Sequence, residues 1–363
     1  MSMAPITSFD LILFISVVLL AVLGATAIVT LGRAVQAARH DRRSEAVRPS
    51  VRYEIIERMS ASDPGWEQWV NDLDPFERFV AKEELQGYLR QVRGKDRETL
   101  QRLGDTLGID TWAECMFKRG DRFDQLAALT WIALLDIDVT LETLRATCMA
   151  HPDTRAAAAR VLYEQDHPAA TTEGTDGLLA EKRPLSMLGL DTLYQLNKED
   201  PRFLLSRAEQ ASDSWPDSLL VQVLRVIGEA GPTSPDVSLD WLGSLFADDS
   251  PLVRAAVADA LAGYGWHDHA RTVIEIENVR RDSSPRVRQA VYRMLGSWGD
   301  QPARDALRDA IRTESDPRSA VVAIEALSEP TSRLGDAELS TASQTALAWV
   351  EATSPNTEAE AAG

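Results

Sequence analysis

The sequence predicts an all-α protein in which a solenoid of stacked helix pairs follows a single membrane-spanning helix. Two observations lead to this prediction. The first is an uncharged, apolar run close to the N-terminus, from Leu11 to Leu31. The second is a series of prolines at intervals of 32, 32, 35, 34 and 32 residues: Pro152, Pro184, Pro216, Pro251, Pro285 and Pro317. Internal repeats of this length are typical of solenoids, which present extended surfaces for binding.

The apolar run reads LILFISVVLLAVLGATAIVTL and contains 21 residues. A helix of about 20 apolar residues spans the core of a bilayer, so residues 11–31 are predicted to form a transmembrane helix. A cleaved signal peptide is the alternative, but it would carry basic residues before a shorter apolar core. Here the only charged side chain before the run is that of Asp10.

The charges that flank this run predict its orientation. Residues 1–10 hold no Lys or Arg, whereas five arginines lie on the other side: Arg33, Arg39, Arg42, Arg43 and Arg48. Because positively charged flanks stay in the cytoplasm, we expect a single-pass protein of the cell membrane. Its N-terminus would lie outside and its solenoid in the cytoplasm.

Small residues gather near one face of the predicted transmembrane helix: Ala21, Gly24, Ala25 and Gly32. Small residues allow two transmembrane helices to approach closely, so these four are candidates for packing against a partner helix. A single-span anchor without such a partner explains them almost as well.

Composition limits the classes of function. The net charge is −18 and the isoelectric point is near 4.8, which argues against a nucleic-acid ligand, since phosphate binding needs basic patches. The acidic, lysine-poor composition fits a high-salt host or a GC-rich genome, and simple solubility explains it equally well. The two cysteines, Cys115 and Cys148, form no CxxC motif, as expected in a reducing compartment.

The segment between the anchor and the repeats is predicted to be helical in its second half. Asp74-Pro75 is typical of an N-cap and first helical residue, and Gly94 separates this helix from the next. The expected organisation is as follows: an extracytoplasmic tail (1–10), a transmembrane helix (11–31), a basic juxtamembrane linker with a turn-rich segment (32–73), a helical N-terminal cap (74–120), repeats (121–352) and a disordered tail (353–363). Residues 33–52 are expected to be either a helical continuation of the anchor or a linker near anionic headgroups.

Each proline is predicted to begin a helix with one apolar face. After Pro251 and Pro285, apolar residues follow with the spacing i, i+3, i+4, i+7, i+8, i+11: Val253, Ala256, Val257, Ala260, Leu261 and Tyr264, then Val287, Ala290, Val291, Met294, Leu295 and Trp298. Acidic residues before the prolines are expected to cap these helices: Asp249, Asp282 and Asp316. Glycines are expected to end them: Gly228, Gly263 and Gly296. Each unit has room for a second helix, for example over residues 266–281 and 301–312, and residues 167–176 are expected to form a loop.

Two of these segments carry a resemblance to a known family. DDSPLVRAAVADALAGYG (Asp248–Gly265) and the segment Asp282–Gly299, which reads SPRVRQAVYRMLGSWG from Ser284 onward, resemble HEAT-like repeats of the subtype first described in phycobilin lyases. Phe79–Ile109 is similar to the lead-in of prokaryotic membrane-anchored HEAT-repeat proteins, whose genes often neighbour a family-2 glycosyltransferase. The resemblance implies a HEAT-like α-solenoid and a membrane protein partner, such as that glycosyltransferase.

Three arginines share one position in their repeats, three residues after the proline: Arg155, Arg254 and Arg288. They would suit a ladder that binds an anionic partner. The structural alternative, which we favour, is an ion pair within each repeat to a preceding acid such as Asp249 or Asp282.

No catalytic constellation, cofactor motif or metal site is predicted. His267-Asp268-His269 is the only local candidate for a metal, but histidines two residues apart diverge on a helix. Phosphate-binding loops, nucleophile elbows and zinc spacings are missing from the sequence.

Three tryptophans near predicted helix ends are candidates for an exposed interaction patch, because tryptophan is enriched in binding hot spots: Trp215, Trp241 and Trp266. A role in the core is the favoured alternative for them, as it is for Trp131 and Trp298.

The function expected from these features is noncatalytic. We expect a membrane-anchored scaffold or regulatory subunit that docks a membrane protein complex, with a polysaccharide-synthesising glycosyltransferase as the partner that the resemblance suggests. The alternatives are a bilin-lyase-like enzyme and a general adaptor for secretion or division machinery.

Overall fold

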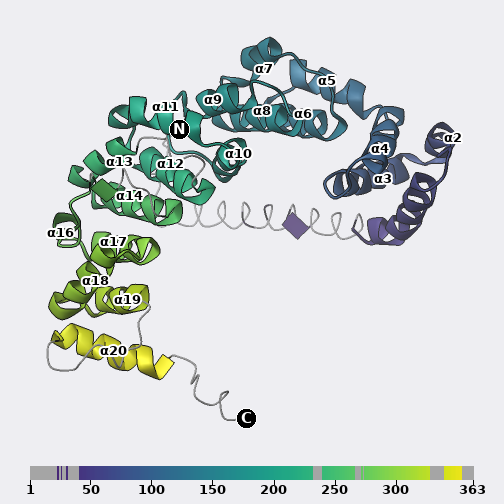
Figure 1. Ribbon diagram of the computed structural model, residues 1–363. Helices are drawn as coiled ribbons and strands as arrows, with labels where there is room; N and C mark the ends of the chain where they lie inside the picture. Colours follow the sequence, from purple (N-terminus) through teal and green to yellow (C-terminus); the bar gives the residue numbers. More distant parts are fainter. Residues whose placement is uncertain are drawn as a thin grey trace, which may run out of the picture. The chain divides into compact units, whose positions relative to one another are not determined.

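The computed structural model describes residues 23, 26, 30, 31, 41–231, 239–265, 271–272, 274–327 and 339–353. The chain forms two compact units (Figure 1). Unit 1 comprises residues 1–115 and 134–137, and unit 2 comprises residues 116–133 and 138–363. All regular elements among the described residues are helices, as the sequence predicts.

Several predictions fall outside the described residues. They concern most of the predicted transmembrane segment 11–31, the tail 354–363 and the small residues Ala21, Gly24, Ala25 and Gly32. In the part of the chain that the structure describes, no helix combines the length and the apolar character needed to cross a bilayer. The membrane anchor therefore stays a prediction.

Unit 1 begins with a helix over residues 41–59, followed by α2 (Trp66–Asp72), α3 (Pro75–Leu89), α4 (Lys95–Thr106) and the first part of α5 (Ile109–Arg119). The predicted start of α3 is confirmed. The Asp74 carboxylate accepts hydrogen bonds from the backbone N–H groups of Phe76 and Glu77 at 2.7 and 2.8 Å. The Glu77 carboxylate in turn accepts a hydrogen bond of 2.8 Å from the backbone N–H of Asp74. This reciprocal cap satisfies backbone donors that have no partner inside the helix.

Of the two alternatives for residues 33–52, the described part agrees with a helix and not with a linker. The turn-rich segment extends only to Gly65, because α2 follows it. Residues 41–59 form a helix that buries Val51 and Ile55, and α2 buries Trp66 and Trp69. The Trp66 indole donates a hydrogen bond of 3.1 Å to the Thr99 carbonyl of α4. The polar sequence hid these elements because their stability comes from contacts with α3 and α4, which are distant in the chain.

Two of the basic residues in this segment bind a buried carboxylate of unit 1. Arg48 Nη1 and Arg52 Nε each lie 2.6 Å from an oxygen of Glu84, whose side chain is 7% exposed. We call this three-residue contact the Glu84 clamp. Arg43 pairs in turn with Asp74 at 3.1 Å. These arginines therefore hold the helix over residues 41–59 on α3, which a solvated linker would not require.

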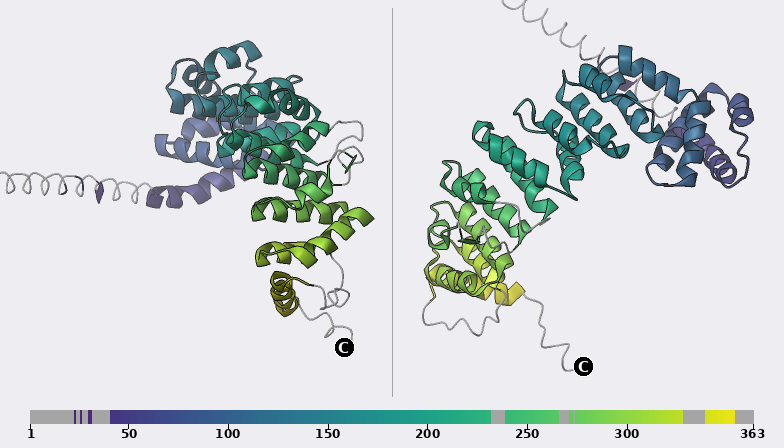
Figure 2. Two further views of the ribbon diagram at one scale, coloured as in Figure 1. Left: turned by 90° about the vertical axis from the view of Figure 1, so that its left-hand side faces the viewer. Right: turned by 45° about the horizontal axis from the view of Figure 1, so that its top comes forward.

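Unit 2 contains most of the helices, and Figure 2 shows them from two further sides. In chain order they are α6 (Arg122–Leu135), α7 (Leu141–Cys148), α8 (Pro152–Glu164), η1 (Ala170–Gly174), α9 (Thr175–Leu179), α10 (Met187–Asn197), α11 (Arg202–Ala211), η2 (Ser212–Ser214), α12 (Asp217–Ala230), α13 (Asp240–Ser244), η3 (Leu245–Ala247), α14 (Pro251–Tyr264), α16 (Ile276–Val279), α17 (Pro285–Trp298), α18 (Gln301–Thr313), α19 (Pro317–Leu327) and α20 (Thr341–Thr353). Helix α6 ends in residues that belong to unit 1.

The helices that follow the repeated prolines stack into one row, with α20 at its end. The prediction that each proline begins a helix is right for α8, α14, α17 and α19, but α12 begins one residue after Pro216 and α10 begins three residues after Pro184. Helices α8, α10, α12, α14, α17, α19 and α20 each pack against the next (Figures 1 and 2). Shorter or more polar helices accompany this row, and α18 matches the predicted second helix Gln301–Arg312. The other predicted second helix, over residues 266–281, is described only in part, with α16 as its regular element. The predicted loop over residues 167–176 is wrong, because η1 and the start of α9 lie there.

The apolar faces predicted for α14 and α17 form the core of this row. In α17 the residues Val287, Ala290, Val291, Met294 and Leu295 are fully buried. One assignment in α14 is wrong, because Ala256 is half-buried whereas its neighbour Ala255 is buried. The other predicted residues of α14, such as Val253, Val257 and Leu261, are buried, so the predicted register holds and the buried face extends to Ala255.

The glycines expected at helix ends lie inside the helices instead. A Cβ atom on Gly263 would lie 2.3 Å from the carbonyl oxygen of Gly228, and one on Gly228 would lie 2.8 Å from Ala260 Cα. Gly296 is similarly close to the backbone of Ala326. The helix ends are formed by other glycines with positive φ angles of 71°, 75° and 61°: Gly231, Gly265 and Gly299. The interior glycines thus allow the backbones of neighbouring helices to touch.

We predict that Gly263→Ala destabilises the protein by about 1–3 kcal/mol, because the added methyl group overlaps the backbone of α12. The measurement is urea unfolding of the full-length protein in mild detergent. The control is Gly87→Ala in α3, where no atom lies within 4 Å of the added Cβ. That change should stabilise unit 1 by up to about 1 kcal/mol, because alanine has the higher helix propensity. Equal effects at the two sites would contradict the close contact.

Candidate interaction face

Arginine side chains at one repeat position join neighbouring turns of unit 2. Arg254 Nη1 donates a hydrogen bond of 2.7 Å to the carbonyl of Asp248, in the turn before its own helix. Its Nε and Nη2 atoms bind both carboxylate oxygens of Asp282, in the turn before the next helix, at 2.7 and 3.0 Å. Arg288 repeats this arrangement with the Asp282 carbonyl at 2.9 Å and with both oxygens of Glu314 at 2.8 Å.

Arg155 binds in the same way to the Met149 carbonyl at 2.8 Å and to Glu181 at 2.6 Å. We call the contacts of these three arginines the arginine brace. The structural role favoured from the sequence agrees with this geometry, but the predicted partners are wrong. The carboxylate comes from the following turn, and the preceding turn supplies backbone carbonyl oxygens. The brace therefore connects one repeat to the next.

The predicted helix caps also need correction. Only Asp316 acts as an N-cap, accepting a hydrogen bond of 2.8 Å from the backbone N–H of Ser319. The Asp282 carboxylate instead accepts hydrogen bonds from the Arg254 guanidinium and from the backbone N–H of Ser284. Burial raises the pKa of Asp282, but these hydrogen bonds outweigh burial and the pKa is lowered overall.

Glu314 is the most strongly held carboxylate of the brace. Burial would raise its pKa, but hydrogen bonds from Arg288, from the backbone N–H of Asp316 and from the Tyr292 hydroxyl lower the pKa to about 2. Burial raises the pKa of Tyr292, so its hydroxyl remains a donor. Glu314 is therefore ionised at neutral pH although it is 4% exposed.

We predict that Glu314→Gln lowers the free energy of unfolding by about 3 kcal/mol at pH 7, because it leaves Arg288 without its counterion. The folded-state pKa of about 2 lies below the ordinary value of 4.5, so this stabilisation is complete above pH 4.5 and is lost as the pH falls towards 2. Urea unfolding of both proteins at neutral and acidic pH measures the effect. A difference that persisted unchanged at pH 2 would contradict this assignment.

Burial raises the pKa of the Cys148 thiol to about 12, which keeps it protonated. Within the described ranges, no group of three or more His, Cys, Asp and Glu side chains is arranged to hold a metal ion. His267 and His269 lie outside these ranges.

The candidate tryptophans do not gather in one exposed patch among the described residues. Trp215 is buried, which agrees with the favoured core alternative and removes it from an exposed patch, and Trp266 lies outside the described residues. Trp241 is half-buried, and its indole N–H is buried without a hydrogen-bond partner. The core assignment is right for Trp298, which is buried, whereas Trp131 is half-buried.

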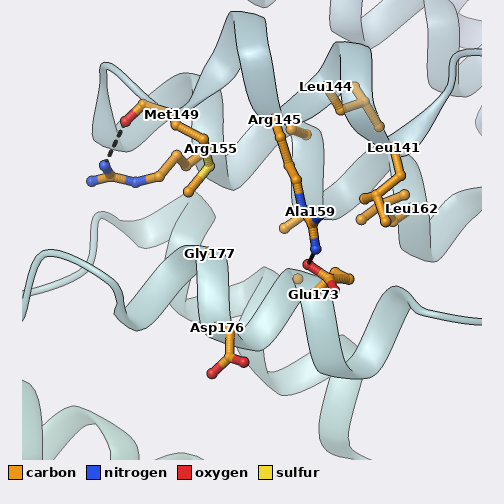
Figure 3. A pocket seen from close by; sticks show the side chains of 12 residues that line it. Leu141, Leu144, Arg145, Met149, Arg155, Ala159, Leu162, Glu173, Asp176 and Gly177 are labelled. Atoms are coloured by element: carbon orange, nitrogen blue, oxygen red, sulfur yellow. Dashed lines mark hydrogen bonds and ion pairs between the residues drawn. The ribbon is translucent and has the colours of Figure 1, made fainter.

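A small pocket of about 170 Å³ lies over α8, between α7 and η1, and Figure 3 shows its lining. Leu141, Leu144 and Leu162 contribute apolar surface. Arg145 and Glu173 form an ion pair with each other (Figure 3). The remaining charged lining residues, Arg155 and Asp176, pair with Glu181 and Arg207 respectively. Every charged side chain that lines this pocket already has an ion-pair partner. The pocket therefore gives no indication of a charged ligand.

A larger apolar hollow of about 440 Å³ lies between α12 and α14, and we call it the α12–α14 groove. Val221 and Leu252 border it, and Leu252 is 45% exposed. Its other apolar lining consists of residues no larger than alanine: Gly228, Ala255, Ala256, Ala260 and Gly263. The same small residues that let the two helices approach leave this groove without side chains to fill it.

The charged residues of the α12–α14 groove differ in whether they are paired. Arg225 pairs with Glu229 at 2.9 Å, and Asp259 pairs with Arg293 of α17 at 2.8 Å. Arg286, the second residue of α17, is exposed and forms no ion pair with any described residue.

A second apolar hollow, the α19–α20 groove, measures about 330 Å³. Its lining includes Val321, Ala346 and Trp349, and Trp349 is 53% exposed. Arg318 lies at its edge, is exposed and also lacks an ion-pair partner among the described residues. Sequence reasoning missed these residues. The available signal was a large apolar or basic residue directly after the proline, outside the predicted apolar face, as at Leu252, Arg286 and Arg318.

Comparison with known proteins agrees with this geometry. A family model of HEAT repeats matches residues 239–328 and 273–362, about a third of the chain. No curated protein and no solved structure matches the chain. The match and the stacked helices together define an all-α, HEAT-like helical solenoid, a class of fold that suggests a scaffold for protein–protein interaction.

Proposed function

We propose that this protein is a noncatalytic, membrane-anchored scaffold or regulatory subunit that docks a membrane protein complex at the cytoplasmic face. The observation that carries the proposal is the row of HEAT-like repeats with two apolar grooves, each bordered by an arginine that forms no ion pair with any described residue. Repeats of this kind form preorganised surfaces, and exposed apolar patches on such surfaces are typical of protein-binding sites.

The sequence of the anchor and the structure of unit 1 support the membrane part of the proposal. The apolar run ends at Leu31, ten residues before the described helix over residues 41–59 begins. The Glu84 clamp fastens that helix to α3. A membrane anchor at residues 11–31 would thus be connected to a folded unit by a short segment, which limits how far unit 1 can move from the membrane.

The identity of the partner rests on resemblance. Prokaryotic membrane-anchored HEAT-repeat proteins are often encoded beside a family-2 glycosyltransferase, and a polysaccharide-synthesising enzyme of that kind is the partner we propose. A general adaptor for secretion or division machinery would have other partners, so the proteins recovered with the full-length chain distinguish the two.

We predict that the N-terminus lies outside the membrane and that the C-terminus lies in the cytoplasm. Cys115 is exposed and Cys148 is buried, so Cys115→Ser provides the background for labelling. In intact cells a membrane-impermeant maleimide should label Ser2→Cys and should spare Gly363→Cys. Labelling of Gly363→Cys alone would contradict the proposed location.

Deletion of residues 1–31 should leave a folded solenoid that loses most of its complex in cells. Its affinity for the isolated partner domain should fall little, because the anchor acts by raising the effective concentration at the membrane. Co-purification and polysaccharide output compare the truncated and full-length proteins in one host. Unchanged partners and output after truncation would contradict the membrane-scaffold function.

The control for this deletion replaces residues 1–31 with an unrelated single-span helix. Recovery of the complex would indicate that tethering is sufficient. Continued loss of the complex would assign a packing role to the small residues that the swap removes, at positions 21, 24 and 25.

A further inference from the structure

We propose that the α12–α14 groove binds a short segment of a partner protein in which a bulky apolar side chain lies next to a carboxylate. This inference rests on the proposed scaffold function and defines the chemistry of the partner at one site. The groove supplies the apolar cavity, and Arg286 supplies the positive charge.

The shape of the groove favours an apolar anchor. Its volume of about 440 Å³ exceeds that of a single large side chain, and its lining is predominantly apolar and small. Leu252 is left 45% exposed at its border. Burial of one Leu, Ile, Phe or Met side chain in such a cavity contributes about 1.5–3 kcal/mol to the free energy of binding. A polar segment would not gain this contribution.

The charges around the groove favour an acidic neighbour for that anchor. Ion pairs join neighbouring helices elsewhere in unit 2: Arg122–Asp153 joins α6 to α8, Arg160–Asp191 joins α8 to α10, and Arg293–Asp259 joins α17 to α14. Among the described residues none joins α12 to α14. The other charges at the groove are already paired, which leaves Arg286 as the cation available to a ligand. The exposed Arg286 guanidinium is complementary to a carboxylate and disfavours a basic segment at this groove.

The groove is also fixed at both ends of α14, so binding requires little ordering of the protein. Gly228 and Gly263 hold the C-terminal halves of α12 and α14 in contact. Arg254 fastens the N-terminal turn of α14 to Asp282. Preorganised sites of this kind lose less conformational entropy on binding than flexible ones.

The α19–α20 groove also combines an exposed arginine with apolar surface, although Arg318 belongs to one of the two helices that form the groove and Arg286 to the helix after them. This recurrence supports the assignment, because the two grooves use different residues to produce the same chemistry.

The test selects short random peptides, displayed on phage, against the full-length protein in mild detergent. We expect the selected peptides to share a Leu, Ile, Phe or Trp beside an Asp or Glu. Fluorescence anisotropy with a labelled selected peptide should show binding weakened roughly tenfold or more by Arg286→Glu, which reverses the complementary charge. Ala256→Trp should weaken binding similarly, because the indole fills the groove.

Matched controls separate the groove from general effects. Ala157→Trp places the same bulk at the equivalent position of α8, five residues after its proline, where the alanine is also half-buried. Arg119→Glu reverses an exposed arginine elsewhere in unit 2. Both controls should bind the peptide as the unmodified protein does. If Ala256→Trp fails to fold, as judged by circular dichroism, Arg286→Glu alone decides the outcome.

Several results would overturn the proposal. They are a failure to select any peptide, a basic or purely polar consensus, and binding that neither variant weakens. Conversion of a dimer to a monomer by Ala256→Trp in light scattering would show that a second copy of the chain occupies the groove instead. If the peptides bind elsewhere, or if Arg286→Glu retains the cellular partners, the proposed binding site is wrong. The proposed scaffold function would not be contradicted by either result.

Discussion

The arginine brace is the interaction on which the order of unit 2 depends. Each guanidinium binds backbone carbonyl oxygens before its own helix and a carboxylate before the next helix, so one side chain fixes the relation of two repeats. Asp282 takes part in two of these interactions. Its carboxylate accepts hydrogen bonds from Arg254, and its backbone carbonyl accepts one from Arg288. Mostly buried, bidentate pairs of this geometry are stronger than exposed ones, and the loss of one partner leaves an uncompensated charge.

The brace and the interior glycines act at opposite ends of the same helices. Arginines hold the N-terminal turns, and Gly228 and Gly263 hold the C-terminal halves of α12 and α14 in backbone contact. Small residues are needed for that contact, and they leave the α12–α14 groove unfilled. The cavity is thus a consequence of how the repeats pack, and its rigidity has the same origin. A rigid apolar groove with an available arginine is suited to hold one segment of a partner in one orientation.

Unit 1 uses buried charge differently. The Glu84 clamp holds the helix over residues 41–59 against α3, and Arg43 joins the cap of α3 through Asp74. Arg43 and Arg48, which predict the orientation of the anchor by the positive-inside rule, therefore also stabilise the fold of unit 1. In the proposed membrane scaffold, these contacts would connect the anchor sequence to the first folded unit, while the grooves of unit 2 would provide the binding surface.

The sequence by itself determined the helical class, the phase of the repeats, the cap at Asp74 and the buried faces of α14 and α17 apart from Ala256. These features follow from local rules, namely helical periodicity and the backbone preferences of proline and aspartate. Only the tertiary structure decided which carboxylates the arginines bind, where the glycines act, that Trp215 is buried and that residues 41–73 are folded. Each of these depends on residues brought together from distant parts of the chain, and a single sequence does not specify such distances. The α12–α14 groove belongs to the second group, because a cavity is defined by the atoms of several helices and by the side chains that glycine and alanine lack.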